Sequence, residues 1–139
     1  MTKLIVDTCV WSLWLRRRNP SLLNANEQQI LAKLREAVEN RRATILGPIR
    51  QEVLSGIRDA AQFAKTASLL DPFLDEPIDS SDYIEAAKLF NLCRDHGIQC
   101  GPVDILICTV AARNHYGILT YDQGLERCIG VLRSKSILS

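Results

Sequence analysis

The chain has 139 residues, of which 47% are hydrophobic and 24% charged, a composition ordinary for a soluble globular protein; we expect a single domain over residues 1–139. Its formal net charge of +1 excludes a global electrostatic attraction to nucleic acid, so any such binding must come from local basic patches. No stretch of 18 or more apolar residues occurs, which excludes a transmembrane helix.

Short apolar stretches alternate with helical patterns along the chain. The predicted elements, in chain order, are a strand Lys3–Val6, helices Val10–Leu15 and Asn26–Arg41, a strand Ala43–Leu46, helices Pro48–Gly56, Arg58–Leu70, Ser80–Asp95 and Pro102–Tyr116, a strand Ile118–Thr120, a short helix near Leu125 and a last strand Gly130–Arg133. Strands that alternate with helices predict an α/β fold. We expect three layers, α/β/α, around a mainly parallel central sheet.

Four acidic residues lie where the predicted elements begin or end: Asp7, Glu52, Asp104 and Asp122. Asp7 and Asp122 follow strands, whereas Glu52 lies one turn into a helix and Asp104 lies at the start of another. Because the carboxyl ends of parallel strands lie along one edge of a sheet, the four can converge in one cleft. Four carboxylates repel one another unless a cation neutralises them, so the pattern predicts a divalent metal such as Mg²⁺. A metal-bound water would suit hydrolysis of a phosphodiester.

Each acid also has a purely structural interpretation. Asp104 could interact with the dipole of a helix N-terminus, and Glu52 could be an exposed helix residue that pairs with Arg50 or Arg58. Asp7 and Asp122 are acceptable as ordinary loop residues. The joint pattern, rather than any single carboxylate, favours the metal site.

Four short motifs resemble those of PIN-domain ribonucleases. They are Asp7-Thr8-Cys9-Val10-Trp11, the segment Pro48–Gly56 with its central Glu52, Asp104-Ile105-Leu106-Ile107 with Ala111-Ala112, and Thr120-Tyr121-Asp122. Their order and spacing cover essentially the whole chain. Its length is similar to that of VapC-type toxins from bacterial type II toxin–antitoxin pairs.

The resemblance implies an endoribonuclease that depends on Mg²⁺ or Mn²⁺. The implied catalytic and metal-binding residues are Asp7, Glu52, Asp104 and Asp122, and the hydroxyls of Thr8 and Thr120 would orient the carboxylates. The resemblance also implies a homodimer, and a partner antitoxin whose C-terminal tail occupies the active-site groove.

The basic run Arg16-Arg17-Arg18 follows the predicted helix that leaves Asp7. It could form a phosphate-contacting rim beside the cleft, although short basic runs are usually solvated surface. His96 and His115 fall in last helical turns, where an imidazole interacts favourably with the dipole, so we do not expect histidine acid–base catalysis. The apolar stretch 60–74 suits either core or a dimer face.

The five cysteines are odd in number and form no C-x-x-C motif. This pattern predicts reduced thiols in a cytoplasmic protein and disfavours a zinc site. We also expect no signal peptide, because Asp7 interrupts the short apolar run Leu4-Ile5-Val6.

Two other functions stay open from the sequence. One is a metal-dependent α/β phosphohydrolase or phosphoacceptor with Asp7 as nucleophile, although no second Asp two residues on and no obvious catalytic Lys accompany it. The other is a non-catalytic RNA-binding module. A phosphate-mimic adduct at Asp7 would support the first, and RNA binding without cleavage in Mn²⁺ would support the second.

Overall fold

The computed structural model describes residues 2–16 and 20–139, so Arg17 and Arg18 of the basic run lie outside the described residues. The elements are β1 (Leu4–Val6), α1 (Thr8–Leu15), η1 (Pro20–Leu22), α2 (Ala25–Glu39), β2 (Ala43–Thr44), α3 (Gly47–Leu54), α4 (Ala60–Leu70), α5 (Ser80–Asp95), α6 (Pro102–Asn114), β3 (Gly117–Leu119) and α7 (Gln123–Ser134). None of the helices in the described ranges combines the length and the apolarity needed to cross a membrane.

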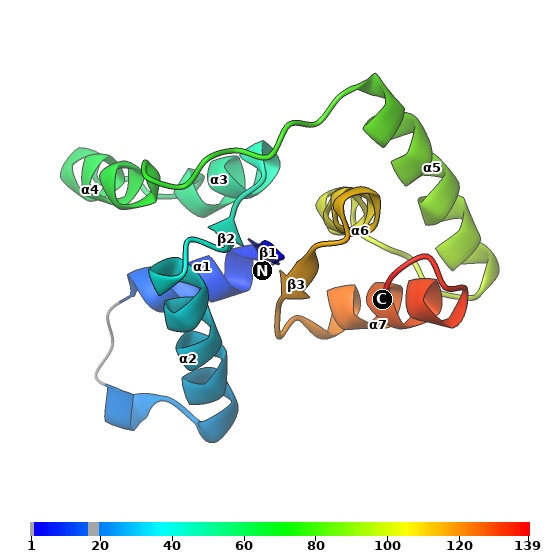
Figure 1. Ribbon diagram of the computed structural model, residues 1–139. Helices are drawn as coiled ribbons and strands as arrows, with labels where there is room; N and C mark the ends of the chain where they lie inside the picture. The colour runs from blue at the N-terminus through cyan, green and yellow to red at the C-terminus, as the bar shows by residue number, and fades with distance from the viewer. Residues whose placement is uncertain (1, 17–19) are drawn as a thin grey trace.

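The strands β1, β2 and β3 form a parallel sheet in the order β2-β1-β3, with helices on both sides (Figure 1). The register pairs Leu4 with Ala43 on one side of β1 and Ile5 with Ile118 on the other. The central strand is buried on both faces, since Ile5 and Val6 are both inaccessible to solvent. Such a strand is typical of a parallel sheet covered by helices on both sides. The predicted α/β fold is confirmed.

Helix α6 passes through the core, as its sequence predicts. Its residues from Ile105 to Ala111 are buried without interruption. It packs against α5, α7 and β3, and a helix that is apolar nearly all round must be covered in this way. Asp104 lies in the first turn of α6, so the packing of this helix in the core fixes the position of its backbone.

The prediction of a last strand over Gly130–Arg133 is wrong, because these residues belong to the helix α7. The buried residues of α7 recur at helical spacing: Leu125, Cys128, Ile129 and Leu132. Gly130 is exposed on the opposite side, where it does not interrupt the helix. A glycine that resembles a breaker in sequence is tolerated within a helix whose other side packs on the core.

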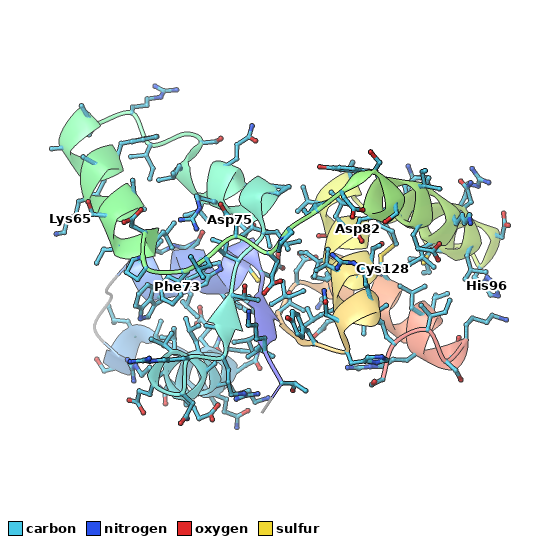
Figure 2. The ribbon with its side chains drawn as sticks, turned by 45° about the horizontal axis from the view of Figure 1, so that its top comes forward. Lys65, Phe73, Asp75, Asp82, His96 and Cys128 are labelled. Atoms are coloured by element: carbon cyan, nitrogen blue, oxygen red, sulfur yellow. A yellow bond between two sulfur atoms is a disulfide. The ribbon has the colours of Figure 1, made fainter. Side chains whose placement is uncertain are left out.

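The prediction of five reduced thiols is also wrong, because Cys100 and Cys128 form a disulfide (Figure 2). Cys9, Cys93 and Cys108 are free. The paired residues are 28 positions apart, one just before α6 and the other within α7, so only the packing of these two helices brings them together.

Candidate active site

Asp7 lies at the carboxyl end of the central strand and caps the N-terminus of α1. Its backbone N–H donates to the carbonyl of Leu119 at 3.0 Å, which extends the pairing of β1 with β3. Its Oδ1 accepts from the backbone N–H of Thr8 at 2.8 Å, and its Oδ2 accepts from Thr120 Oγ1 at 2.8 Å and from Cys9 Sγ at 3.5 Å. The side chain is only 5% exposed. These three donors fix the carboxylate in one orientation.

Thr120 connects Asp7 to Asp122. While its hydroxyl donates to Asp7, the same Oγ1 accepts from the backbone N–H of Asp122 at 3.0 Å. Asp122 caps α7, and its Oδ2 accepts from the backbone N–H of Leu125 at 2.9 Å. Two acids 115 positions apart in the sequence therefore share one hydroxyl at the same edge of the sheet.

Glu52 is joined to this group through Thr8. The hydroxyl of Thr8, in the first turn of α1, donates to Glu52 Oε2 on α3 at 3.1 Å. Glu52 is exposed, in contrast to Asp7. Thr8 therefore orients one carboxylate oxygen of Glu52, while the carboxylate stays open to solvent.

Asp104 lies in the first turn of α6, and its carboxyl is strongly perturbed. Its pKa is raised from 3.8 to about 6, first by burial and then by the negative charges of Asp7, Asp122 and Glu52. Repulsion from all three indicates that the four acids face a common region.

A cavity of about 550 Å³ opens between the length of α3 and the first turn of α6. Glu52 and Asp104 lie on its two sides. Two glycines leave space beside the carboxylates of Asp104 and Asp122. A Cβ on Gly101 would lie 3.4 Å from Asp104 Oδ2, and a Cβ on Gly124 would lie 3.1 Å from Asp122 Oδ2. These backbone positions leave room for a ligand beside the acids.

Among the residues that the structure describes, the negative charge of this group is not compensated by ion pairs with protein cations. Within residues 2–16 and 20–139, none of the observed ion pairs involves any of the four acids. Over the same ranges no three His, Cys, Asp or Glu side chains are already arranged to hold an ion. An all-oxygen group of this kind fits a hard divalent cation that keeps several of its waters, as Mg²⁺ does.

Of the predicted basic rim, Arg16 is described, and it lies exposed just beyond α1. Burial raises the pKa of the Tyr121 phenol, whereas the charge of Arg16 lowers it, so the guanidinium lies near the loop that carries Asp122. No partner for the Arg16 side chain appears among the described residues.

The sequence did not reveal the roles of Cys9 and Tyr121. The carbonyl of Cys9 accepts from Tyr121 Oη at 3.4 Å, and its thiol approaches both Asp7 and Thr120. Burial raises the pKa of this thiol, which keeps it protonated and makes it a hydrogen-bond donor rather than a nucleophile. The position of Cys9 two residues after Asp7 was the only available signal.

The two histidines lie at helix ends, as expected. His96 is the C-cap of α5, with Nδ1 at 2.9 Å from the carbonyl of Leu92, and His115 is the C-cap of α6.

A comparison with protein families matches residues 4–129 to the family described as PIN domain. The matched span runs from β1 into α7 and contains all four acids. A comparison with curated proteins gave no match.

Proposed function

The chain belongs to the PIN domain family, whose fold is that of metal-dependent nucleases, and we propose that it is an endoribonuclease that hydrolyses RNA phosphodiester bonds with a divalent metal. The observation that carries the proposal is the acidic group at one sheet edge, in which no carboxylate forms an ion pair with a described residue. Asp104 is the clearest member, because its pKa of about 6 reflects both burial and the charges of the other three acids. Such an arrangement is costly without a cation and useful with one.

We propose Mg²⁺ or Mn²⁺ as the cofactor, held most directly by Asp7 and Asp104. Oδ2 of Asp7 already accepts two hydrogen bonds, so Oδ1 is the freer oxygen for a metal. The ion, when bound, would activate a water and neutralise charge on the phosphate. Glu52 and Asp122, the two exposed acids, would orient metal-bound water.

The threonines act on the carboxylates rather than on the RNA. Thr8 orients Glu52, and Thr120 orients Asp7 and Asp122 together. Groups that hold metal ligands in this way tune both geometry and basicity. Without such support, carboxylates that repel one another would turn apart.

We also propose that the protein is the toxin of a toxin–antitoxin pair, acts as a homodimer and is inhibited by a cognate antitoxin. The length and the motif order support this role. Helix α4 is largely exposed, with Phe63 41% exposed on it and Leu74 78% exposed shortly after it, so an apolar surface is available for a protein partner. A gene for a small DNA-binding protein beside this gene would support the role.

The proposed site of action is the cytoplasm, where cellular RNA is found. The disulfide does not conflict with this location if it is shielded from reductants. Cys128 is inaccessible and Cys100 is 4% exposed, and thiol–disulfide exchange requires direct access to a sulfur atom.

The proposal is tested by incubating the purified protein with total cellular RNA, with Mn²⁺ or Mg²⁺ and with excess chelator. We expect fragments only with the metal and none with Asp104→Asn. This variant is the better inactive control, because Asp7 has structural hydrogen bonds that a substitution would break. Cleavage that persists in chelator or in Asp104→Asn would contradict the proposal.

The same preparations separate the other functions. A beryllofluoride adduct at Asp7 would favour the phosphohydrolase or phosphoacceptor, and tight RNA binding in Mn²⁺ without fragments would favour the binding module.

A further inference from the structure

We call the cavity lined by Glu52 and Asp104 the acidic cleft. A second hollow lies beside it, between α1, α3 and α4. Its volume is about 240 Å³. It is lined by apolar and polar side chains, chiefly Ser12, Leu15, Arg16, Val53, Ile57 and Gln62. Sites for drug-sized ligands are usually about 300–1,000 Å³, so this hollow suits a smaller group.

The hollow begins one helical turn from the acids. Ser12 is four residues after Thr8 on α1, and Val53 follows Glu52 on α3. Residues four apart on a helix are neighbours on one face. The hydrogen bond between Thr8 and Glu52 therefore marks the border between the acidic cleft and the hollow.

The lining has the chemistry to bind a nucleotide. Leu15, Val53 and Ile57 form an apolar wall, against which a base can pack. The side-chain amide of Gln62 has no partner among the described residues and can both donate to and accept from a base edge. Proteins read single-stranded RNA in this manner, by contact with base faces and hydrogen bonds to base edges.

Binding an RNA phosphate requires a positive charge, which Arg16 supplies at the hollow. Its guanidinium is exposed, and no described residue pairs with it. Arg16 lines the hollow together with Ser12, which lies four residues after Thr8 on the same face of α1. A guanidinium binds phosphate through two parallel hydrogen bonds, so Arg16 can bind a phosphate of an RNA that occupies the hollow.

We propose that this hollow is a nucleotide subsite, in which Arg16 binds a phosphate of the RNA, the apolar wall takes the base and Gln62 reads its edge. The inference rests on the proposed nuclease function and names the residues that give it sequence preference. The small size of the hollow, together with the Arg16 guanidinium and the Gln62 side-chain amide, which both lack a partner among the described residues, favours a single nucleotide of RNA over a protein segment.

The first test measures binding of short fluorescent single-stranded RNA to the Asp104→Asn protein, which leaves the RNA uncleaved. Adding Arg16→Gln should weaken binding roughly tenfold at low salt and reduce the slope of log K against log salt by about 0.7, because one phosphate contact is lost. Arg94→Gln removes the same charge from the exposed face of α5 and should change neither quantity.

The second test compares oligonucleotides that differ in one base. Gln62→Ala should leave the salt slope unchanged and make the four affinities nearly equal. Gln99→Ala, an identical change at an exposed residue between α5 and α6, should keep the original ranking.

The outcomes separate the two proposals. If Arg16→Gln keeps the salt slope, or if Gln62→Ala keeps the base ranking, the subsite is overturned even when the wild-type protein cleaves RNA with metal. If the wild-type protein cleaves no RNA but both substitutions act as described, the subsite stands and the nuclease proposal fails. Circular dichroism melts of each variant establish that every protein compared is folded.

Discussion

Thr120 is the residue on which the geometry of the candidate site depends most. Its hydroxyl donates to a buried carboxylate and accepts from a backbone N–H, so both of its hydrogen-bonding functions are used. At 9% exposure it has little water to replace either partner. Its removal should therefore affect both stability and the orientation of Asp7 and Asp122.

We predict that Thr120→Val lowers the free energy of unfolding by about 1–3 kcal/mol, because it leaves a buried carboxylate oxygen and a backbone N–H without this partner. Urea unfolding measures the loss, and Thr120→Ser should restore most of it. Thr109→Val is the matched control, since that buried hydroxyl bonds only to the carbonyl of Ile105 in its own helix. A valine at 120 that costs no more than the control would show that the hydroxyl has no such role.

The second prediction at this scale concerns Asp104. Its folded-state pKa of about 6 exceeds its ordinary value of 3.8, so between these pH values the folded protein holds a proton that the unfolded chain has released. The stabilising contribution of this proton is present below pH 3.8 and lost as the pH rises through about 6. Asp104→Asn should therefore raise the melting temperature of metal-free protein at pH 8 and change it little near pH 4.

Thermal melts at the two pH values check this prediction. Salt should shrink the gain at pH 8 without removing it, because burial, which salt does not screen, is the largest single cause of the raised pKa. Glu85→Gln, on the exposed part of α5, controls for the loss of one negative charge. A lower melting temperature for Asp104→Asn at pH 8 would instead indicate that the carboxylate mainly stabilises the start of α6.

At the scale of elements, α6 and α7 position two of the four acids. Asp104 lies in the first turn of α6 and Asp122 caps α7, while the disulfide joins the residue before Gly101 to the middle of α7. The crosslink therefore ties the start of one acid-bearing helix to the body of the other. It should restrict the relative movement of the two helices as well as stabilise the fold.

We predict that reduction of this disulfide lowers the free energy of unfolding by about 3–4 kcal/mol, as expected for a crosslink that closes a loop of 28 residues. Denaturation in the presence and absence of dithiothreitol measures the difference. In the double variant Cys100→Ala, Cys128→Ala, dithiothreitol should have no effect. A count of five free thiols in unreduced, denatured wild-type protein would disprove the disulfide.

At the scale of the whole molecule, the four acids come from segments spread from residue 7 to residue 122. They lie toward one edge of the sheet because β1 and β3 are neighbours in the parallel sheet and because α3 and α6 begin near that same edge. A cation that binds them would connect distant parts of the chain. Metal binding should therefore stabilise the entire fold.

The fourth prediction follows from this linkage. Mn²⁺ at 100 times its dissociation constant should stabilise the wild-type protein by about 2.7 kcal/mol and raise its melting temperature by roughly 8 °C. The gain should shrink in Asp104→Asn and persist in Glu85→Gln. An equal response in all three proteins would place the ion elsewhere.

Much of the candidate site could be proposed from the sequence because the signals for its residues are local. Acids that directly follow apolar strands, or that lie in the first turn of a helix, can be recognised within a few residues. The helix α5 was expected to start after a cap at Ser80 or Asp79 and to reach Asp95, and it is observed over Ser80–Asp95 with Asp79 as its N-cap. The prediction of a strand at Gly130–Arg133 was wrong because the apolar residues there continue the helical spacing of α7.

The sequence by itself therefore determined the α/β class and most of the elements, and it predicted the four acids as a candidate site. Only the tertiary structure decided that Cys100 pairs with Cys128, that Thr120 serves two acids and that a hollow with Arg16 and Gln62 lies beside the cleft. The physical reason is range: strand ends and helix starts are set by neighbouring residues, whereas these contacts depend on how whole elements pack.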